Sequence, residues 1–154
     1  MSDERQEGVD LVVERFERLA CRQCGKKLQV GNIAPFSIIE CPECHTRQPV
    51  PALLGNFMLI ESLGSGGMGT VYRAVDQALG RPVAVKVMRH SLSSDPQFVE
   101  NFLREARTAA ALNHRHVVQV YSCGTEKEQP YIVMELVDGG HLDAMIAAGQ
   151  PIDE

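Results

Sequence analysis

Three glycines and one lysine within residues 63–87 form a pattern suited to binding an anion. Gly64, Gly66 and Gly69 have G-x-G-x-x-G spacing, and Lys86 follows seventeen positions after the last glycine inside an apolar run. Glycine has no Cβ, so backbone N–H groups in such a loop can approach an anion closely. Dinucleotide-binding turns and ordinary tight turns share this spacing, and the residues that follow must decide between them.

Those following residues predict strands rather than a helix. Residues 70–75 are β-prone, residues 80–82 have turn chemistry, and residues 82–88 are predicted as another strand. A dinucleotide fold would begin a helix at the third glycine, and a Walker loop would place Gly-Lys-Ser/Thr after the glycines. Neither pattern occurs, so we expect the glycines in a hairpin.

Four cysteines form a second chemical group. Two Cys-x-x-Cys pairs separated by sixteen residues have the spacing of a tetrahedral zinc site, against the less favoured alternatives of disulfides or redox pairs. Four thiolates would close the coordination shell, so we expect a structural Zn²⁺ and no vacancy for His45. Residues 19–48 resemble zinc ribbons, and metal binding would supply the folding energy of so small a segment. The expected ligands are Cys21, Cys24, Cys41 and Cys44.

The glycine segment has a wider resemblance. LGSGGMGTVYRA followed by V-A-V-K resembles the start of a protein kinase domain, and most of all the bacterial serine/threonine kinases of the eukaryotic type. The resemblance runs from about residue 54 to the last residue. It implies that Lys86 holds the α and β phosphates of ATP and that a helix glutamate positions this lysine. It also implies nucleotide contacts from Leu63, Gly64, Ser65, Gly66, Gly67, Met68, Gly69, Val71, Ala84, Lys86, Met134, Glu135 and Val137.

A helix is predicted over residues 97–112, with Ser94 or Asp95 as its cap. Its apolar stripe also contains Glu105. Because an unpaired buried carboxylate is costly, we expect Glu105 to pair with Lys86, the same partner that the resemblance implies. In the alternative, Glu105 faces solvent between apolar neighbours. The other members of the stripe are Phe98, Phe102, Ala109 and Leu112.

Strands are expected at residues 57–63, 117–121 and 131–137, with a polar turn at 124–130. Together with the glycine hairpin they complete a five-stranded antiparallel sheet with one main helix, an α+β fold. Cys123 is expected as a small buried residue.

The end of the last strand resembles the hinge of a kinase. The resemblance places Met134 beside the adenine and pairs the adenine edge with the Glu135 carbonyl and the Val137 N–H. Val71 and Ala84 would cover the faces of the ring. Considered singly, Met134, Val71 and Ala84 would be core positions.

We divide the chain into four parts. The prolines at 49 and 51 mark a linker between the ribbon and the sheet. The lead-in is expected as either a short amphipathic helix or a strand. A further short helix is expected at 141–148. The parts are a lead-in at 1–18, the zinc ribbon at 19–48, the linker at 49–55, and the kinase N-lobe with hinge and first C-lobe helix at 56–154.

Composition excludes several classes of protein. The net charge of −5 and pI near 5.5 argue against a general binder of nucleic acid. The 154 residues contain no long apolar stretch, so we expect neither a secretory signal nor a membrane span, and a cytoplasmic location unless a later segment anchors the parent protein.

Two motifs that kinases need are absent from these 154 residues. Neither the H-R-D catalytic loop nor the D-F-G metal-binding motif occurs, so the base and the Mg²⁺ ligands are missing. We therefore expect the ATP-binding part of a kinase for protein serine and threonine hydroxyls, inactive by itself. The alternative is a non-catalytic module in which the ribbon and a small sheet bind a protein partner.

Overall fold

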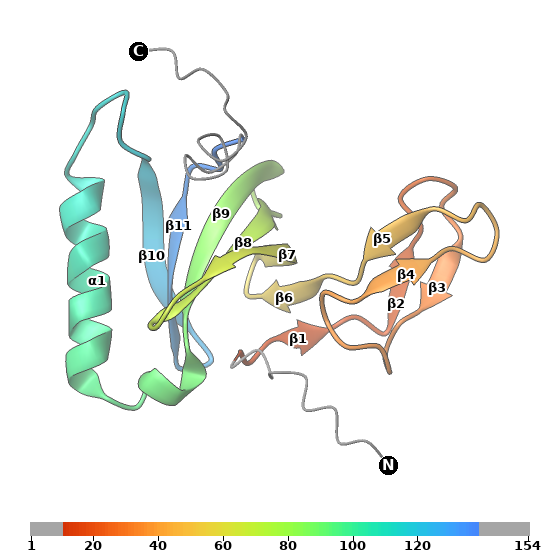
Figure 1. Ribbon diagram of the computed structural model, residues 1–154, viewed down its shortest axis with the longest axis horizontal. Coiled ribbons are helices and arrows are strands. Elements are labelled where there is room, and N and C mark those ends of the chain that lie inside the picture. The colour runs from red at the N-terminus through yellow and green to blue at the C-terminus, as the bar shows by residue number, and fades with distance from the viewer. Residues whose placement is uncertain (1–10, 139–154) are drawn as a thin grey trace, which may run out of the picture.

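The computed structural model describes residues 11–138, which form an antiparallel sheet with one main helix and a smaller unit of two hairpins (Figure 1). The sheet has the strand order β1-β6-β7-β8-β9-β11-β10. Its strands are β1 (Glu14–Arg15), β6 (Ala52–Leu54), β7 (Phe57–Ser65), β8 (Gly69–Asp76), β9 (Arg81–Met88), β10 (Val120–Glu126) and β11 (Gln129–Met134). The helix predicted at 141–148 lies outside the described residues.

The five predicted strands are present, although the last two lie at 120–126 and 129–134 rather than at 117–121 and 131–137, and two further strands join them. β6 forms inside the stretch that was predicted as a linker, because Ala52 and Leu54 alternate toward the core and are 0% and 1% exposed. Pro51 precedes this strand, where its missing N–H removes no bond from the ladder. β1 forms in the lead-in and pairs with β6, so the strand interpretation of the lead-in holds there.

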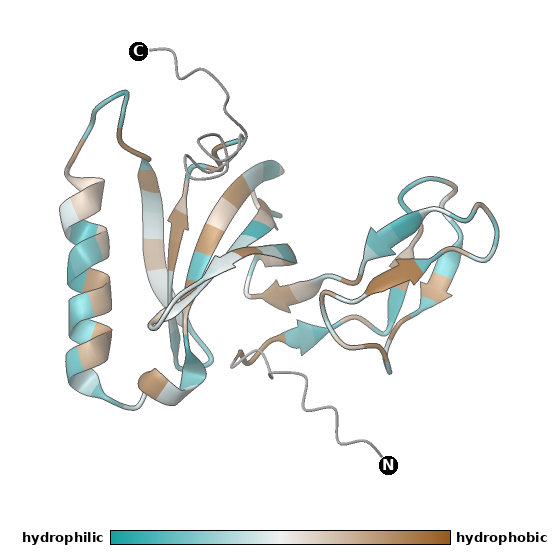
Figure 2. Ribbon diagram, viewed as in Figure 1, coloured by the Kyte–Doolittle hydropathy of each residue, from teal (hydrophilic) through white to brown (hydrophobic). Residues whose placement is uncertain are grey.

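Helix α1 (Pro96–Ala110) covers one face of the sheet. Asp95 caps it by accepting a hydrogen bond of 2.9 Å from the Gln97 N–H. Phe102 and Ala106 are buried against Met88 and Ile132 of the sheet. Figure 2 shows the corresponding mixture of hydrophilic and hydrophobic residues along α1.

The opposite face of the sheet is covered by the N-terminal part of the chain. Its core is centred on buried residues of β8 and β9, and partly buried residues from the lead-in and from the two-hairpin unit pack against it. The residues from the sheet include Tyr72, Ala74, Val83, Val85 and Val87, and the covering residues include Leu11, Val13 and Phe36.

The two-hairpin unit is the predicted ribbon. β2 (Arg18–Ala20) pairs with β3 (Lys27–Gln29), and β4 (Ile38–Glu40) pairs with β5 (Arg47–Pro49). Each hairpin holds one Cys-x-x-Cys pair at its turn. In Figure 1 this unit joins the sheet through β1 and β6.

The last hairpin corrects two predictions. β10 and β11 extend toward each other and leave a turn of only Lys127 and Glu128, both with positive φ of 49° and 62°, instead of the predicted turn over 124–130. Two positive φ values are typical of a tight type I′ turn, which matches the twist of the strands. Cys123 is exposed rather than buried, because β10 is the edge strand of the sheet.

Within residues 11–138, no helix has the length and apolar character that crossing a membrane requires.

Candidate functional sites

The four predicted cysteine ligands converge. Their sulfur atoms lie within 4.8 Å of one another, and none of the four cysteines is in a disulfide. The Sγ atoms of Cys21 and Cys44 are 3.6 Å apart, as are those of Cys24 and Cys41. Zinc–sulfur bonds of about 2.3 Å in a tetrahedron separate the sulfurs by roughly 3.8 Å. The donor set and its spacing therefore fit one tetrahedral metal ion.

Equivalent turns present the two cysteine pairs. The Cys21 N–H donates to the Lys26 carbonyl at 2.8 Å, and the Cys41 N–H donates to the Thr46 carbonyl at 2.9 Å. Directly after the second cysteine of each pair the backbone is left-handed, with φ of 75° at Gly25 and 58° at His45. The His45 Nδ1 lies 2.9 Å from the Glu40 carboxylate, away from the sulfurs. His45 is thus a turn residue.

Nearby polar groups alter the acidity of the thiols. A hydrogen bond from the Cys24 amide lowers the pKa of Cys21. The side chain and then the backbone of Thr46 lower the pKa of Cys44 to about 6. The Lys26 amide lowers the pKa of Cys24, but desolvation and the neighbouring thiols outweigh it and raise this pKa to about 12. A bound cation would favour the thiolate form of all four.

The glycines lie at the tip of the β7–β8 hairpin, as predicted. The Gly66 N–H donates to the Gly69 carbonyl at 2.9 Å and closes the turn. A Cβ added at Gly64, Gly66 or Gly67 would meet nothing within 4 Å, so the backbone there is open to a ligand. Gly69 has a different function, since a Cβ would collide with the carbonyl oxygen of Val87. It permits close packing of β8 on β9.

Two backbone donors at this tip are free. Within residues 11–138 the N–H groups of Gly67 and Met68 have no hydrogen-bond partner. The Met68 side chain packs toward the α1 core, which holds the tip close to the sheet. Successive free N–H groups in a turn form a concave site for anions, so the tip can accept phosphate oxygens.

The strands bring several predicted site residues to one face. Lys86 is half-buried in β9 and lies opposite Val71 of β8. Ala84, two positions before Lys86 in β9, lies opposite Met134 of β11. Because residues directly opposite each other project from the same side of a sheet, these four side chains share the face that α1 also covers.

Glu105 does not form the predicted pair with Lys86. It is exposed, and none of the ion pairs found within residues 11–138 includes it. The Lys86 ammonium instead lies 5.8 Å from the centre of the Phe102 ring. Helix α1 turns Phe102 and Ala106 toward the sheet, and at about 100° per residue this leaves Glu105 roughly 80° to one side. The solvent-facing alternative therefore describes this structure.

The predicted hinge follows β11. The Glu135 N–H donates to the Gln119 carbonyl at 2.9 Å. The Glu135 carbonyl and the Val137 N–H have no partner among the described residues, and Val137 is 62% exposed. The Asp138 carboxylate lies 3.7 Å from the Arg73 guanidinium of β8. Both polar groups that the resemblance assigned to the adenine edge are thus available, and their contact with adenine stays a prediction.

Contacts between the N-terminal part and the sheet were not predicted. Gln129 is 0% exposed, and its side-chain amide donates to the Val12 carbonyl at 2.6 Å and accepts from the Val12 N–H at 2.8 Å. The Phe36 ring of the ribbon stacks on Tyr72 of β8, with centroids 5.0 Å apart and planes at 26°. A single glutamine at a turn and a single aromatic residue in a loop have no periodic signal that could have revealed them.

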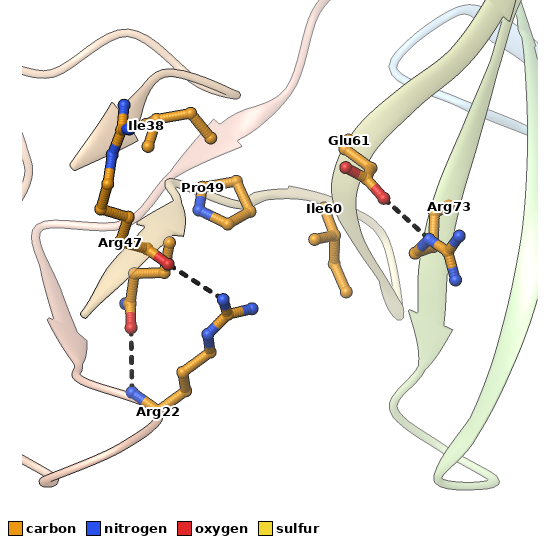
Figure 3. Close-up of a pocket in the computed structure, with 8 residues that line it drawn as sticks. Arg22, Ile38, Arg47, Pro49, Ile60, Glu61 and Arg73 are labelled. Atoms are coloured by element: carbon orange, nitrogen blue, oxygen red, sulfur yellow. Dashed lines mark hydrogen bonds and ion pairs between the residues drawn. The ribbon is translucent and has the colours of Figure 1, made fainter. Parts of the chain in front are cut away.

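An open cleft of about 670 Å³ lies between the ribbon and the first strands of the sheet (Figure 3). Arg22 on its wall donates to the Arg47 carbonyl at 2.9 Å, and Arg73 pairs with Glu61 at 2.9 Å. Lys86 and the glycine tip do not line it, so this cleft is separate from the predicted nucleotide site. Its lining residues are Arg22, Ile38, Arg47, Gln48, Pro49, Ile60, Glu61 and Arg73.

Comparisons with known proteins match the sheet and helix. Residues 57–154 match the protein kinase domain family, a match that begins after the ribbon. The serine/threonine-protein kinase PknL of Mycobacterium tuberculosis is 43% identical over 112 residues, 71% of this chain and 28% of PknL. PknA from the same organism is 46% identical over 99 residues, 61% of this chain and 23% of PknA. The chain thus spans about a quarter of the length of these relatives.

A solved structure agrees with this match. The M. tuberculosis PknI kinase domain is 29% identical and has a TM-score of 0.53, covering 65% of this chain and 40% of that domain.

Proposed function

This chain belongs to the protein kinase domain family, and we propose that residues 57–138 supply the ATP-binding part of a kinase that phosphorylates serine and threonine hydroxyls of proteins. The observation that carries the proposal is the glycine tip with free N–H groups at Gly67 and Met68, on the hairpin whose second strand places Val71 opposite Lys86. In this arrangement a flexible anion cradle and a fixed cation act on the same phosphate chain.

Each part has one task in the proposed reaction. The amides of the glycine tip and the ammonium of Lys86 bind and orient the phosphates, which places the γ-phosphoryl group for in-line attack. Val71 and Ala84 enclose the adenine. The hinge residues Met134, Glu135 and Val137 select it through their backbone and the Met134 side chain.

Glu105 keeps a proposed role in the nucleotide-bound domain. There it would hold Lys86 in place, which requires α1 to turn its Glu105 edge toward β9. Mg²⁺ neutralises phosphate charge in this reaction, and the H-R-D and D-F-G motifs that would hold it and supply the base are not among these 154 residues. The chain by itself should therefore transfer no phosphate to a protein acceptor.

A nucleotide titration tests the proposal. In a polypeptide extended to include the catalytic and metal-binding loops, Lys86→Ala should weaken ATP binding by about 10- to 100-fold, the loss expected for a charge-assisted hydrogen bond. Lys27→Ala, which changes an exposed lysine of the ribbon, should leave binding unchanged. Equal ATP affinity of wild type and Lys86→Ala would favour the alternative, a non-catalytic interaction module.

For the cysteine site we propose one structural Zn²⁺ per chain. Elemental analysis of freshly purified, reduced protein should find about one equivalent, and chelation should unfold residues 19–48 because metal binding and folding of the ribbon are coupled. Cys41→Ser should lose the metal, whereas Cys123→Ser, a change at the exposed fifth cysteine, should retain it. Metal-free wild-type protein with an intact ribbon would contradict the proposal.

We further propose that the ribbon contacts a protein partner or serves as a scaffold, and that the protein acts in the cytoplasm. Four thiols held together without a disulfide suit a reducing compartment. Protection of ribbon amides from exchange by a cytoplasmic binding partner would support this, and a ribbon recovered in oxidised form from cells would argue against it.

A further inference from the structure

We propose that Arg89, directly after β9, is a positioning residue for the glycine tip, residues 66–68, and sets the direction of the Gly67 amide, one of the two free donors proposed to bind phosphate. The proposal rests on the proposed ATP site, but its structural part can be tested without nucleotide. Arg89 lies three positions after Lys86 and was not among the predicted site residues.

Arg89 holds the tip through its side chain and its backbone. The guanidinium Nη2 and Nε donate to the Gly66 carbonyl at 3.0 and 3.3 Å. The Arg89 N–H donates to the Met68 carbonyl at 2.9 Å. Two of the three carbonyls of the tip, at Gly66 and Met68, are thus tied to a single residue.

The bond to the Gly66 carbonyl fixes the direction of one free donor, the Gly67 N–H. Residues 11–138 contain no cis peptide bond, and a trans peptide unit is planar with its C=O and N–H pointing in opposite directions. When Arg89 holds the Gly66 carbonyl, the Gly67 N–H of the same unit must point away from Arg89. The side of the tip opposite Arg89 is where that free donor is presented, with open space around Gly67.

The backbone of Arg89 is held by its neighbours, whereas Gly66 and Gly67 have few restraints. Arg89 directly follows β9 and is the N-cap of the 3₁₀ turn η1 (His90–Leu92), and its own carbonyl accepts from the Leu92 N–H at 3.0 Å. Gly66 and Gly67 are exposed and have no side chain that could restrain them. Glycine loses more backbone freedom on ordering than any other residue, so an unrestrained tip would have to be ordered by the nucleotide at a cost in affinity.

Three variants test the proposal: Arg89→Ala, Arg89→Lys, and the control Arg104→Ala, which removes an exposed arginine of α1 whose guanidinium lies 3.6 Å from the Glu100 carboxylate. In the unliganded 154-residue chain, NMR order parameters of the Gly66 and Gly67 amides should fall from about 0.85 to below about 0.6 in Arg89→Ala. Arg89→Lys can donate only one bond and should give intermediate values. Arg104→Ala should match wild type.

Kinetics supply the second readout. In the extended kinase, Arg89→Ala should raise KM for ATP roughly fivefold, because it removes both exposed hydrogen bonds of the guanidinium to the Gly66 carbonyl, with kcat within about twofold. Unchanged order parameters in Arg89→Ala, or an unchanged KM, would overturn the proposal. If Arg89→Ala left the order parameters unchanged and weakened the binding of ATP more than that of ADP, Arg89 would bind the γ-phosphate itself. If wild type binds no ATP, the proposed function fails, while the order parameters still decide whether Arg89 holds the tip.

Discussion

The contact between Phe36 and Tyr72 predicts that the ribbon stabilises the sheet. Phe36 is half-buried and stacks on a tyrosine that is 1% exposed. Removing a fully buried phenylalanine costs about 3–5 kcal/mol, so Phe36→Ala should cost about half of that, roughly 2 kcal/mol, including the lost stacking.

The backbone at Phe36 makes the prediction sharper. Its φ of 69° is left-handed, which costs a non-glycine residue about 1–2 kcal/mol. Phe36→Gly removes that cost. Glycine also makes the unfolded chain more flexible than alanine does, which lowers the stability of the folded state by only about 0.4–1 kcal/mol. Phe36→Gly should therefore be more stable than Phe36→Ala by roughly 0.5–1 kcal/mol, the reverse of the order at an ordinary position.

Urea unfolding of the reduced, zinc-saturated chain measures these differences. Leu79→Ala serves as the control, because Leu79 is 66% exposed and its loss should cost less than about 0.5 kcal/mol. With the metal chelated, the effect of Phe36→Ala should largely disappear, since the ribbon is then unfolded. If Phe36→Ala lowered the free energy of unfolding as little as the control does, the ribbon would not stabilise the sheet. If Phe36→Ala were more stable than Phe36→Gly, the left-handed backbone at this position would be contradicted.

Three other predictions follow from single contacts. Gly69→Ala should destabilise the chain by more than about 2 kcal/mol in urea unfolding because of the collision with β9, whereas Gly64→Ala, with open space around it, should fold normally; equal stabilities would contradict the distinction. Asp95→Ala should cost about 1 kcal/mol by loss of the α1 cap, and an unchanged midpoint of helix unfolding by circular dichroism would count against it. Burial raises the pKa of Tyr72, so the folded state favours its neutral phenol. The contribution of this phenol to the free energy of unfolding should be complete below pH ~10, the ordinary tyrosine pKa, and should be lost as the pH rises from there through the folded-state pKa. Stability curves measured between pH 8 and 11 should therefore fall less steeply for Tyr72→Phe, and parallel curves would exclude this contribution.

Local patterns predicted most of the fold. The β-prone runs on both sides of the glycines and the capped helix are signals within a few residues, and the strands and α1 appear where these signals lie. β6 was missed and β1 was expected only as one of two alternatives, because two and three residues are too few for a period to be recognised. β6 pairs locally with β7, but the pairing of β1 with β6 joins Glu14 to Leu53, 39 positions away, which no local pattern encodes.

The candidate sites were predictable to different degrees. The cysteine site was predictable, because the spacing within each pair determines the turn that presents the sulfurs. Glu105 was expected among the buried residues of α1, because the stripe was centred with the help of Phe98 and Leu112, near the two ends of the helix, which are 41% and 52% exposed. Arg89 carried no signal at all, since its function depends on the path of a loop 23 residues earlier.

The alternation of side chains along β8 and β9 explains how two modules can use the same strands. Val71 and Lys86 face α1 and the predicted nucleotide, while the next residue on β8, Tyr72, faces the ribbon together with its partner Val85. Alternate residues in the middle of these strands thus belong to the core that Phe36 and the lead-in complete: Tyr72, Ala74, Val83, Val85 and Val87. If the N-terminal part were absent, that apolar face would be open to water directly behind the predicted phosphate-binding residues. Phe36 of the ribbon and Leu11 and Val13 of the lead-in therefore complete one hydrophobic core of the kinase sheet, while the rest of the ribbon keeps a separate core around its cysteines.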